Sequence, residues 1–313
     1  IKKLYLNDKA PVGIKSEFAY DAEKLKITRF LVNKEYEMEG SLSFTGNKEM
    51  EFTVKAKEGN PEALFGLLKI PYKKAGGAIN GEMKIKGPLN ELEGFGSFSA
   101  DKFRYNDYLS DKTEMNFRFE KNRFVLERLA FLAGEDYLLV KGECPLNRPI
   151  KFETELEFKK NVLKDSYSGQ IAVNGLIDRN IKVGLRSKKI LRNDRPLSPL
   201  TAEFVYAPDG RKLNIRYLNF GDELQLKGNA AFSEKVSYNL EAAAKMLELT
   251  AFSFVSGAFN TAPSQNLTGN IRLSGQGASW RADGSVRIFP LITTFSKAES
   301  LQADFSATRP FNN

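Results

Sequence analysis

A seven-residue pattern of alternating apolar and polar residues occurs three times along the chain, at 81–87, 169–175 and 269–275. Each copy begins and ends with glycine, and we refer to it as the Gly-x5-Gly pattern. Apolar residues or glycines occupy the odd positions, and polar residues occupy almost all the even ones. Because successive side chains of a strand point to opposite faces, each copy predicts a strand with one apolar and one solvated face.

Similar alternation fills most of the remaining chain. Four strands are predicted before the first copy, at 14–20, 25–32, 36–44 and 50–56, and further strands continue to about residue 305.

Two segments predict short helices instead. In 60–68, Asn60 is a suitable N-cap and Pro61 suits the first helical position. From Glu241 to about Gly257, apolar residues such as Ala242 and Met246 recur at helical spacing. The sequence therefore predicts an all-β, mainly antiparallel fold with two short helices.

A longer hairpin pattern also recurs, with final glycines at Gly40, Gly142 and Gly228. These glycines and the first glycines of the Gly-x5-Gly copies both give a period of roughly 90 to 100 residues. We therefore expect one continuous repeat body with approximate repeats 14–75, 76–166, 167–266 and 267–313, the last incomplete. Because the chain begins with isoleucine and ends directly after a strand-like run, we interpret it as an internal piece of a longer protein.

Composition narrows the class of protein. Of the 313 residues, 42% are hydrophobic and 27% charged, which fits a folded chain rather than a disordered one. The net charge of +8 does not predict nucleic-acid binding, because the basic residues alternate with apolar ones and are interspersed with acids. The longest apolar region, 242–259, contains Lys245 and Glu248 and is too short to cross a membrane as a helix.

The chain lacks the residues that most catalytic sites use. It has no histidine and a single cysteine, Cys144, which lies in the apolar phase and is expected to be a small buried side chain. The many glutamates occupy polar strand faces, and the Gly-Phe-Gly segment at 94–96 does not open a helix as a nucleotide-binding motif would. We therefore expect no enzymatic activity, no cofactor and no metal site.

The apolar hairpins ending in glycine, the Gly-x5-Gly strands and the short Leu-rich helix together resemble the AsmA-like proteins, which include TamB. The resemblance implies an elongated, U-shaped β-taco sheet with a continuous apolar groove. It also implies intermembrane phospholipid transport in the bacterial periplasm, with an inner-membrane anchor outside this chain. Phospholipid acyl chains are the expected partners, together with docking proteins at the inner and outer membranes.

On this hypothesis acyl chains slide along the apolar face while head groups stay in water. Twelve apolar side chains are predicted to line the groove, from all three Gly-x5-Gly copies and all three hairpins: Tyr36, Met38, Met83, Ile85, Leu138, Val140, Ile171, Val173, Leu224, Leu226, Ile271 and Leu273.

Two other functions are compatible with the same alternation of apolar and polar residues. The apolar face could be the closed core of a β-sandwich with a scaffolding or adhesive role. Exposed strand edges could instead assist the assembly of outer-membrane proteins. Glycines on the apolar face fit either room for acyl chains or a tight bend of the sheet, and the pattern alone does not separate these roles.

Overall fold

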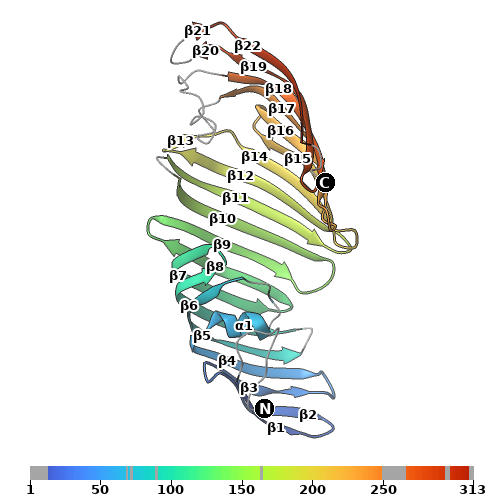
Figure 1. The fold of residues 1–313 in the computed structure, drawn as a ribbon. Coiled ribbons are helices and arrows are strands. Elements are labelled where there is room, and N and C mark those ends of the chain that lie inside the picture. Colours follow the sequence, from blue (N-terminus) through green and yellow to red (C-terminus); the bar gives the residue numbers. More distant parts are fainter. Residues whose placement is uncertain are drawn as a thin grey trace. The chain divides into compact units, whose positions relative to one another are not determined.

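The computed structural model describes residues 13–67, 70, 73–88, 91–162, 165–248, 266–292 and 297–309. In these residues the chain is all-β apart from one short helix, and twenty strands belong to one open antiparallel sheet (Figure 1). The chain divides into two compact units, 1–160 and 161–313, which are described separately below. The all-β, antiparallel prediction is confirmed.

Unit 1 is a meander in which each strand pairs antiparallel with the next. Its elements are β1 (Ile14–Tyr20), β2 (Lys24–Val32), β3 (Tyr36–Ser43), β4 (Glu49–Gly59), α1 (Pro61–Leu67), β5 (Ala75–Pro88), β6 (Glu93–Tyr105), β7 (Tyr108–Glu120), β8 (Arg123–Ala133), β9 (Asp136–Pro145) and β10 (Ile150–Val162).

Unit 2 continues the same style of pairing, with β12 pairing both β13 and β14, and β19 pairing β22. Its strands are β11 (Asp165–Ile177), β12 (Ile181–Arg192), β13 (Arg195–Pro196), β14 (Leu200–Ala207), β15 (Lys212–Phe220), β16 (Leu224–Ala231), β17 (Ser237–Glu248), β18 (Asn266–Gln276), β19 (Ser279–Phe289) and β22 (Leu301–Arg309). Two short strands, β20 (Leu291–Ile292) and β21 (Lys297–Ala298), pair with each other.

The three recurring hairpins share a detail of backbone pairing. In β2–β3, β8–β9 and β15–β16 an apolar residue lies opposite the final glycine, and the register shifts immediately afterwards. The three pairs are Ile27 with Gly40, Leu126 with Gly142, and Ile215 with Gly228. Such a shift is a β-bulge, which bends a strand locally. The sequence repeat is therefore also a repeat of backbone geometry.

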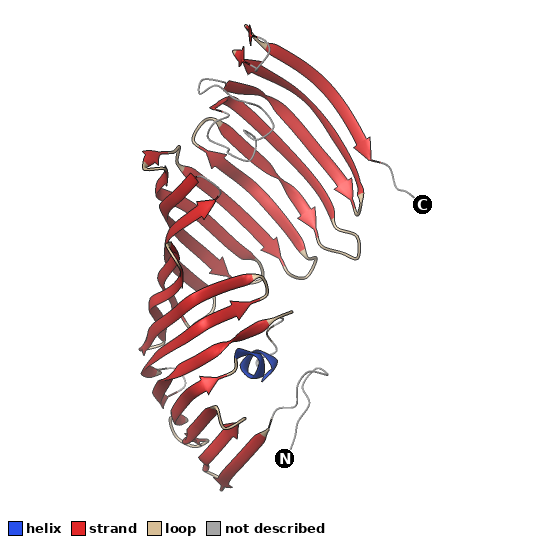
Figure 2. Ribbon diagram, turned by 60° about the vertical axis from the view of Figure 1, so that its left-hand side comes forward, coloured by secondary structure: helices blue, strands red, loops and turns tan. Residues whose placement is uncertain are grey.

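Helix α1 follows β4 and confirms the first predicted helix. The backbone N–H of Glu62 donates a hydrogen bond to Oδ1 of Asn60 at 2.9 Å, so Asn60 acts as the expected N-cap. Ala63 of the helix packs with Val32, Tyr36 and Ala56 in a buried cluster on the apolar side of β2–β4. Figure 2 shows α1 against one face of the strands of unit 1.

The second predicted helix is wrong over the part that the structure describes. Residues 241–248 belong to β17, which pairs with β16 on one side and β18 on the other. Residues 249–257 lie outside the described residues. The alanine run at 242–244 favours a helix locally, but pairing of these residues with β16 and β18 outweighs this weak preference.

Few hydrophobic side chains are buried. Among the described residues these are Val32, Tyr36, Ala56, Ala63, Ala100, Phe117, Ala130, Ala202 and Leu247, beside the fully buried Pro61. Most of the apolar face is therefore half-exposed rather than enclosed as a core.

Candidate apolar binding face

The apolar residues of unit 1 lie directly opposite one another across successive strands. One row, written in strand order from β3 to β10, consists of Met38, Val54, Met83, Gly96, Phe117, Leu126, Gly142 and Thr154. A parallel row contains Tyr36, Ala56, Gly81, Phe98, Met115, Leu129, Val140 and Leu156. Together the rows make a nearly continuous apolar stripe across eight strands.

Unit 2 carries an equivalent row from β11 to β22. Its members are Val173, Leu185, Ala202, Leu218, Leu226, Ala242, Ile271, Gly284 and Phe305. None of these residues is charged, and all but Ala202 retain some solvent exposure. Each unit therefore presents an apolar stripe that runs across its strands.

All twelve predicted lining residues lie in described strands, and several share a row. Met38 and Met83 lie in one row of unit 1, Tyr36 and Val140 lie in the other, and the row of unit 2 contains Val173, Leu226 and Ile271. Tyr36 is buried, Leu138 and Ile271 are exposed, and the other nine are half-buried. The remaining five lie on neighbouring registers of the same strands: Ile85, Leu138, Ile171, Leu224 and Leu273.

Tyr36 differs from the others because α1 covers it. Its hydroxyl donates a hydrogen bond to the backbone oxygen of Asn60 at 2.9 Å. Burial, and secondarily the neighbouring Glu35, raises the pKa of the Tyr36 phenol above its ordinary value. Tyr36 therefore holds α1 against the sheet, and it offers little surface to a ligand.

Sequence reasoning missed a cluster of four phenylalanines on the same face of unit 1. The ring of Phe117 stacks on that of Phe98 at 6.3 Å between centroids, and it contacts Phe119 and Phe124 at 5.7 and 5.4 Å. Phe117 is only 5% exposed. The alternating phase of the phenylalanines was a usable signal, because it places them on the same face as Met83.

The structure also separates the two roles considered for the glycines. Gly81 and Gly269, which open two of the Gly-x5-Gly copies, have φ angles of 150° and 152°. A Cβ atom at Gly81 would overlap the backbone oxygen of Ser97 on the paired strand, and one at Gly269 would overlap that of Ser285. These glycines are required by the backbone and by close strand approach, rather than by room for a ligand.

Gly96 has a different role, because the Phe117 ring lies where its Cβ would be. The space above this glycine is filled by the protein itself.

The opposite face of the sheet is polar and crossed by ion pairs. On β16–β18, Glu241 lies between Lys227 and Arg272, at 3.1 and 3.3 Å. On β7–β8, Arg118 pairs with Glu120 at 2.6 Å and also with Glu127. These side chains are largely exposed, so each pair adds little stability, but together they keep this face solvated.

Two carboxyl groups on the polar face have perturbed acidity. A hydrogen bond from Lys112 lowers the pKa of Glu114, and hydrogen bonds from Arg281 and Ser306 lower that of Asp283. Both shifts have partners on the same or a neighbouring strand, so ion pairing within the sheet explains them.

Cys144 is half-buried on the apolar face, and burial raises the pKa of its thiol. No three Cys, Asp or Glu side chains of the described residues are grouped as metal ligands would be. No helix in this part of the chain is long and apolar enough to cross a membrane.

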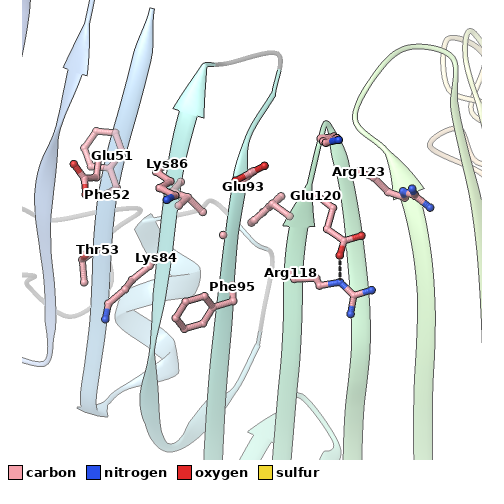
Figure 3. Close-up of a pocket in the computed structure, with 14 residues that line it drawn as sticks. Glu51, Phe52, Thr53, Lys84, Lys86, Glu93, Phe95, Arg118, Glu120 and Arg123 are labelled. Atoms are coloured by element: carbon pink, nitrogen blue, oxygen red, sulfur yellow. Dashed lines mark ion pairs between the residues drawn. The ribbon is translucent and has the colours of Figure 1, made fainter.

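A hollow with a volume of about 880 Å³ lies on the polar face of β4–β8 (Figure 3). Five basic and three acidic side chains line it, with the exposed ring of Phe95 among them.

Comparison with protein-family models, with curated proteins and with solved structures found no match to this chain.

Proposed function

We propose that the apolar stripe of each unit binds the acyl chains of phospholipids. The observation that carries the proposal is the unbroken series of apolar neighbours from Val173 to Phe305 in unit 2, all of which except Ala202 keep some solvent exposure. An apolar surface of this extent on a folded protein is typical of a binding surface for apolar partners.

The size of the hydrophobic effect supports a lipid as the partner. A phospholipid carries roughly 30 acyl methylenes at about 0.8 kcal/mol each, so exposing its chains to water costs on the order of 20 kcal/mol. A stripe of aliphatic side chains recovers part of that free energy. Because such contacts have no preferred direction, acyl chains could slide along the stripe without leaving a discrete site.

The biological setting is a second part of the proposal. The repeat style that resembles the AsmA-like proteins favours the bacterial periplasm, with transport of phospholipid between the inner and outer membranes. In that setting a U-shaped groove would shield the acyl chains while the head groups remain in water. Docking proteins at the two membranes would bind the ends of the groove.

A closed β-sandwich needs a second layer over the apolar face. In the described residues one open sheet accounts for twenty strands, and the other sheet is only the short pair β20–β21. This arrangement favours an open stripe over a closed core.

Assembly of outer-membrane proteins remains a second candidate because of the strand edges. Over the described residues β22 pairs only with β19, so the other side of its ladder is open for pairing with an added strand.

Lipid co-purification tests the main proposal. The intact chain would be purified under mild conditions, its organic extract analysed by mass spectrometry, and its bound phospholipid counted. Met83→Asp and Ile171→Asp place a charge on the apolar face and should each reduce bound lipid severalfold.

Ser97→Asp and Asn174→Asp are matched controls, because they add the same charge on the polar face of nearby strands. They should leave bound lipid unchanged. A folded wild-type chain without lipid, or equal losses in all four variants, would contradict the proposal.

A further inference from the structure

The exposed ring of Phe95 occupies an unusual place in the hollow on the polar face of unit 1. It lies on β6, directly opposite Lys84 of β5 and Arg118 of β7. The ring is 53% exposed, and Figure 3 shows it between these two basic side chains. Adjacent strands are about 4.8 Å apart, so the two cationic strands flank Phe95 at about 10 Å from each other.

Unit 2 contains the same arrangement with one difference. On its polar face Glu241 of β17 lies directly opposite Lys227 of β16 and Arg272 of β18. The Glu241 carboxylate pairs with both cations, at 3.1 and 3.3 Å. The triplet is therefore cation, anion, cation in unit 2, and cation, phenyl ring, cation in unit 1.

The acids around the unit 1 triplet do not fill its centre. Lys84 pairs at 3.5 Å with Glu82 of its own strand, and Arg118 pairs with Glu120 of its own strand and with Glu127 of β8. Of the other lining groups, Lys86 lies opposite both Glu51 and Glu93. No carboxylate among these pairs bridges Lys84 and Arg118 as Glu241 bridges Lys227 and Arg272.

We propose that this hollow binds a ligand in which a phosphate or carboxylate group is joined to an apolar moiety. The anionic group would take the place that the Glu241 carboxylate has in unit 2, between Lys84 and Arg118. The apolar moiety would cover the Phe95 ring, and about 880 Å³ is within the range of pockets for small ligands. This site is on the face opposite the apolar stripe and does not depend on lipid transport.

Titration calorimetry with three probes tests the proposal: phenyl phosphate, inorganic phosphate and monomeric dihexanoyl phosphatidylglycerol. Phenyl phosphate should bind with a stoichiometry of one, about tenfold or more tighter than inorganic phosphate, and more weakly as ionic strength rises. Binding of the short-chain lipid at the same site would identify a lipid head group as the source, and its failure would identify a soluble ligand.

Phe95→Glu copies the unit 2 triplet into unit 1 and should abolish phenyl phosphate binding, because the protein then supplies its own anion. Lys84→Gln combined with Arg118→Gln should weaken phenyl phosphate binding at least tenfold, although the Phe95 ring is still present. The reciprocal variant Glu241→Phe should raise the stoichiometry from one to two. Circular dichroism would verify that each variant is folded, which is expected because these side chains are exposed.

The proposal is overturned if wild-type protein binds no phenyl phosphate, or binds it no better than inorganic phosphate. It is also overturned if folded Phe95→Glu binds phenyl phosphate with wild-type affinity. For the lipid probe, only the difference between wild type and Phe95→Glu reports on this site, since the apolar stripe is unchanged in that variant.

Discussion

The two units share their backbone geometry but fill their apolar faces differently. In unit 1 the face carries the Phe98–Phe117–Phe119–Phe124 cluster, and α1 covers the end that includes Tyr36. In unit 2 the corresponding row is mainly aliphatic, and Phe305 is its one aromatic residue. Seven of the nine buried hydrophobic side chains of the described residues belong to unit 1, as does the fully buried Pro61.

This difference indicates a division of roles. In the described residues unit 1 uses more of its apolar surface for its own packing, whereas unit 2 leaves more of it exposed to solvent. The shared bulges and glycines set the path of the backbone in both units, and the side chains of each row decide how much of the stripe remains exposed.

The largest expected effect is on the stability of unit 1. Phe117→Ala removes a ring that is almost fully buried and should lower the free energy of unfolding by about 3–5 kcal/mol. Leu226→Ala in unit 2 removes a half-exposed side chain and should cost only about 1–2 kcal/mol. Denaturant unfolding followed by hydrogen exchange would assign each loss to its unit, and equal losses would contradict the comparison.

The glycines of the Gly-x5-Gly pattern should have similar effects in the two units. Gly81→Ala and Gly269→Ala each force a side chain into a φ near 150° and against a backbone oxygen, at an expected cost of about 1–3 kcal/mol. Gly66→Ala in α1 is the control, because a Cβ there meets no atom within 4 Å. It should stabilise the protein by up to about 1 kcal/mol. Thermal unfolding of the three variants tests this, and tolerance of both strand substitutions would refute the backbone role.

A smaller effect on the free energy of unfolding should distinguish Tyr36, the first residue of β3, from Leu224, the first residue of β16. Tyr36→Phe removes the hydroxyl that donates to the backbone oxygen of Asn60, at a cost of about 0.5–1.5 kcal/mol. That oxygen keeps its second donor, the backbone N–H of Ala63 at 3.2 Å. Leu224 begins β16, and the matched change Leu224→Met should be close to neutral because no hydrogen bond is lost. Equal shifts in melting temperature would show that the hydroxyl contributes nothing.

The smallest expected effect is on pH dependence. Glu114 and Asp283 have pKa values below their ordinary 4.5 and 3.8, so their ion pairs stabilise the fold at neutral pH. That contribution should fall as the pH drops below the ordinary values and through the lowered ones. Glu114→Gln and Asp283→Asn should each slightly reduce the acid sensitivity of melting. Because the chain has no histidine, stability should change little between about pH 6 and 8. A steep change there would contradict these assignments.

Much of the fold could be predicted because strand periodicity is a local signal. Alternation placed Met83 and Val173 on the apolar face, and the Asn60-Pro61 pair located α1. Residues 241–248 show where a local signal fails. Their alanine run is typical of a helix, but pairing with β16 and β18 makes the segment a strand. Pairing between strands is a long-range property that periodicity does not contain.

The candidate site was predictable only in part for the same reason. Which face is apolar follows from residue phase, but the filling of that face depends on cross-strand neighbours. Phe117 lies over Gly96 of the next strand, and Glu241 lies between two cations from two other strands. Neither relation can be read from a single segment of the sequence.

Photocrosslinking tests the central claim most directly. A diazirine-bearing amino acid would replace Met83 or Val173 on the apolar stripe, and Ser97 or Asn174 on the polar face. After activation with bound phospholipid, the first two positions should form adducts with acyl chains and the last two should not. The absence of adducts at Met83 and Val173 in folded protein, or equal labelling of both faces, would contradict an acyl-binding stripe.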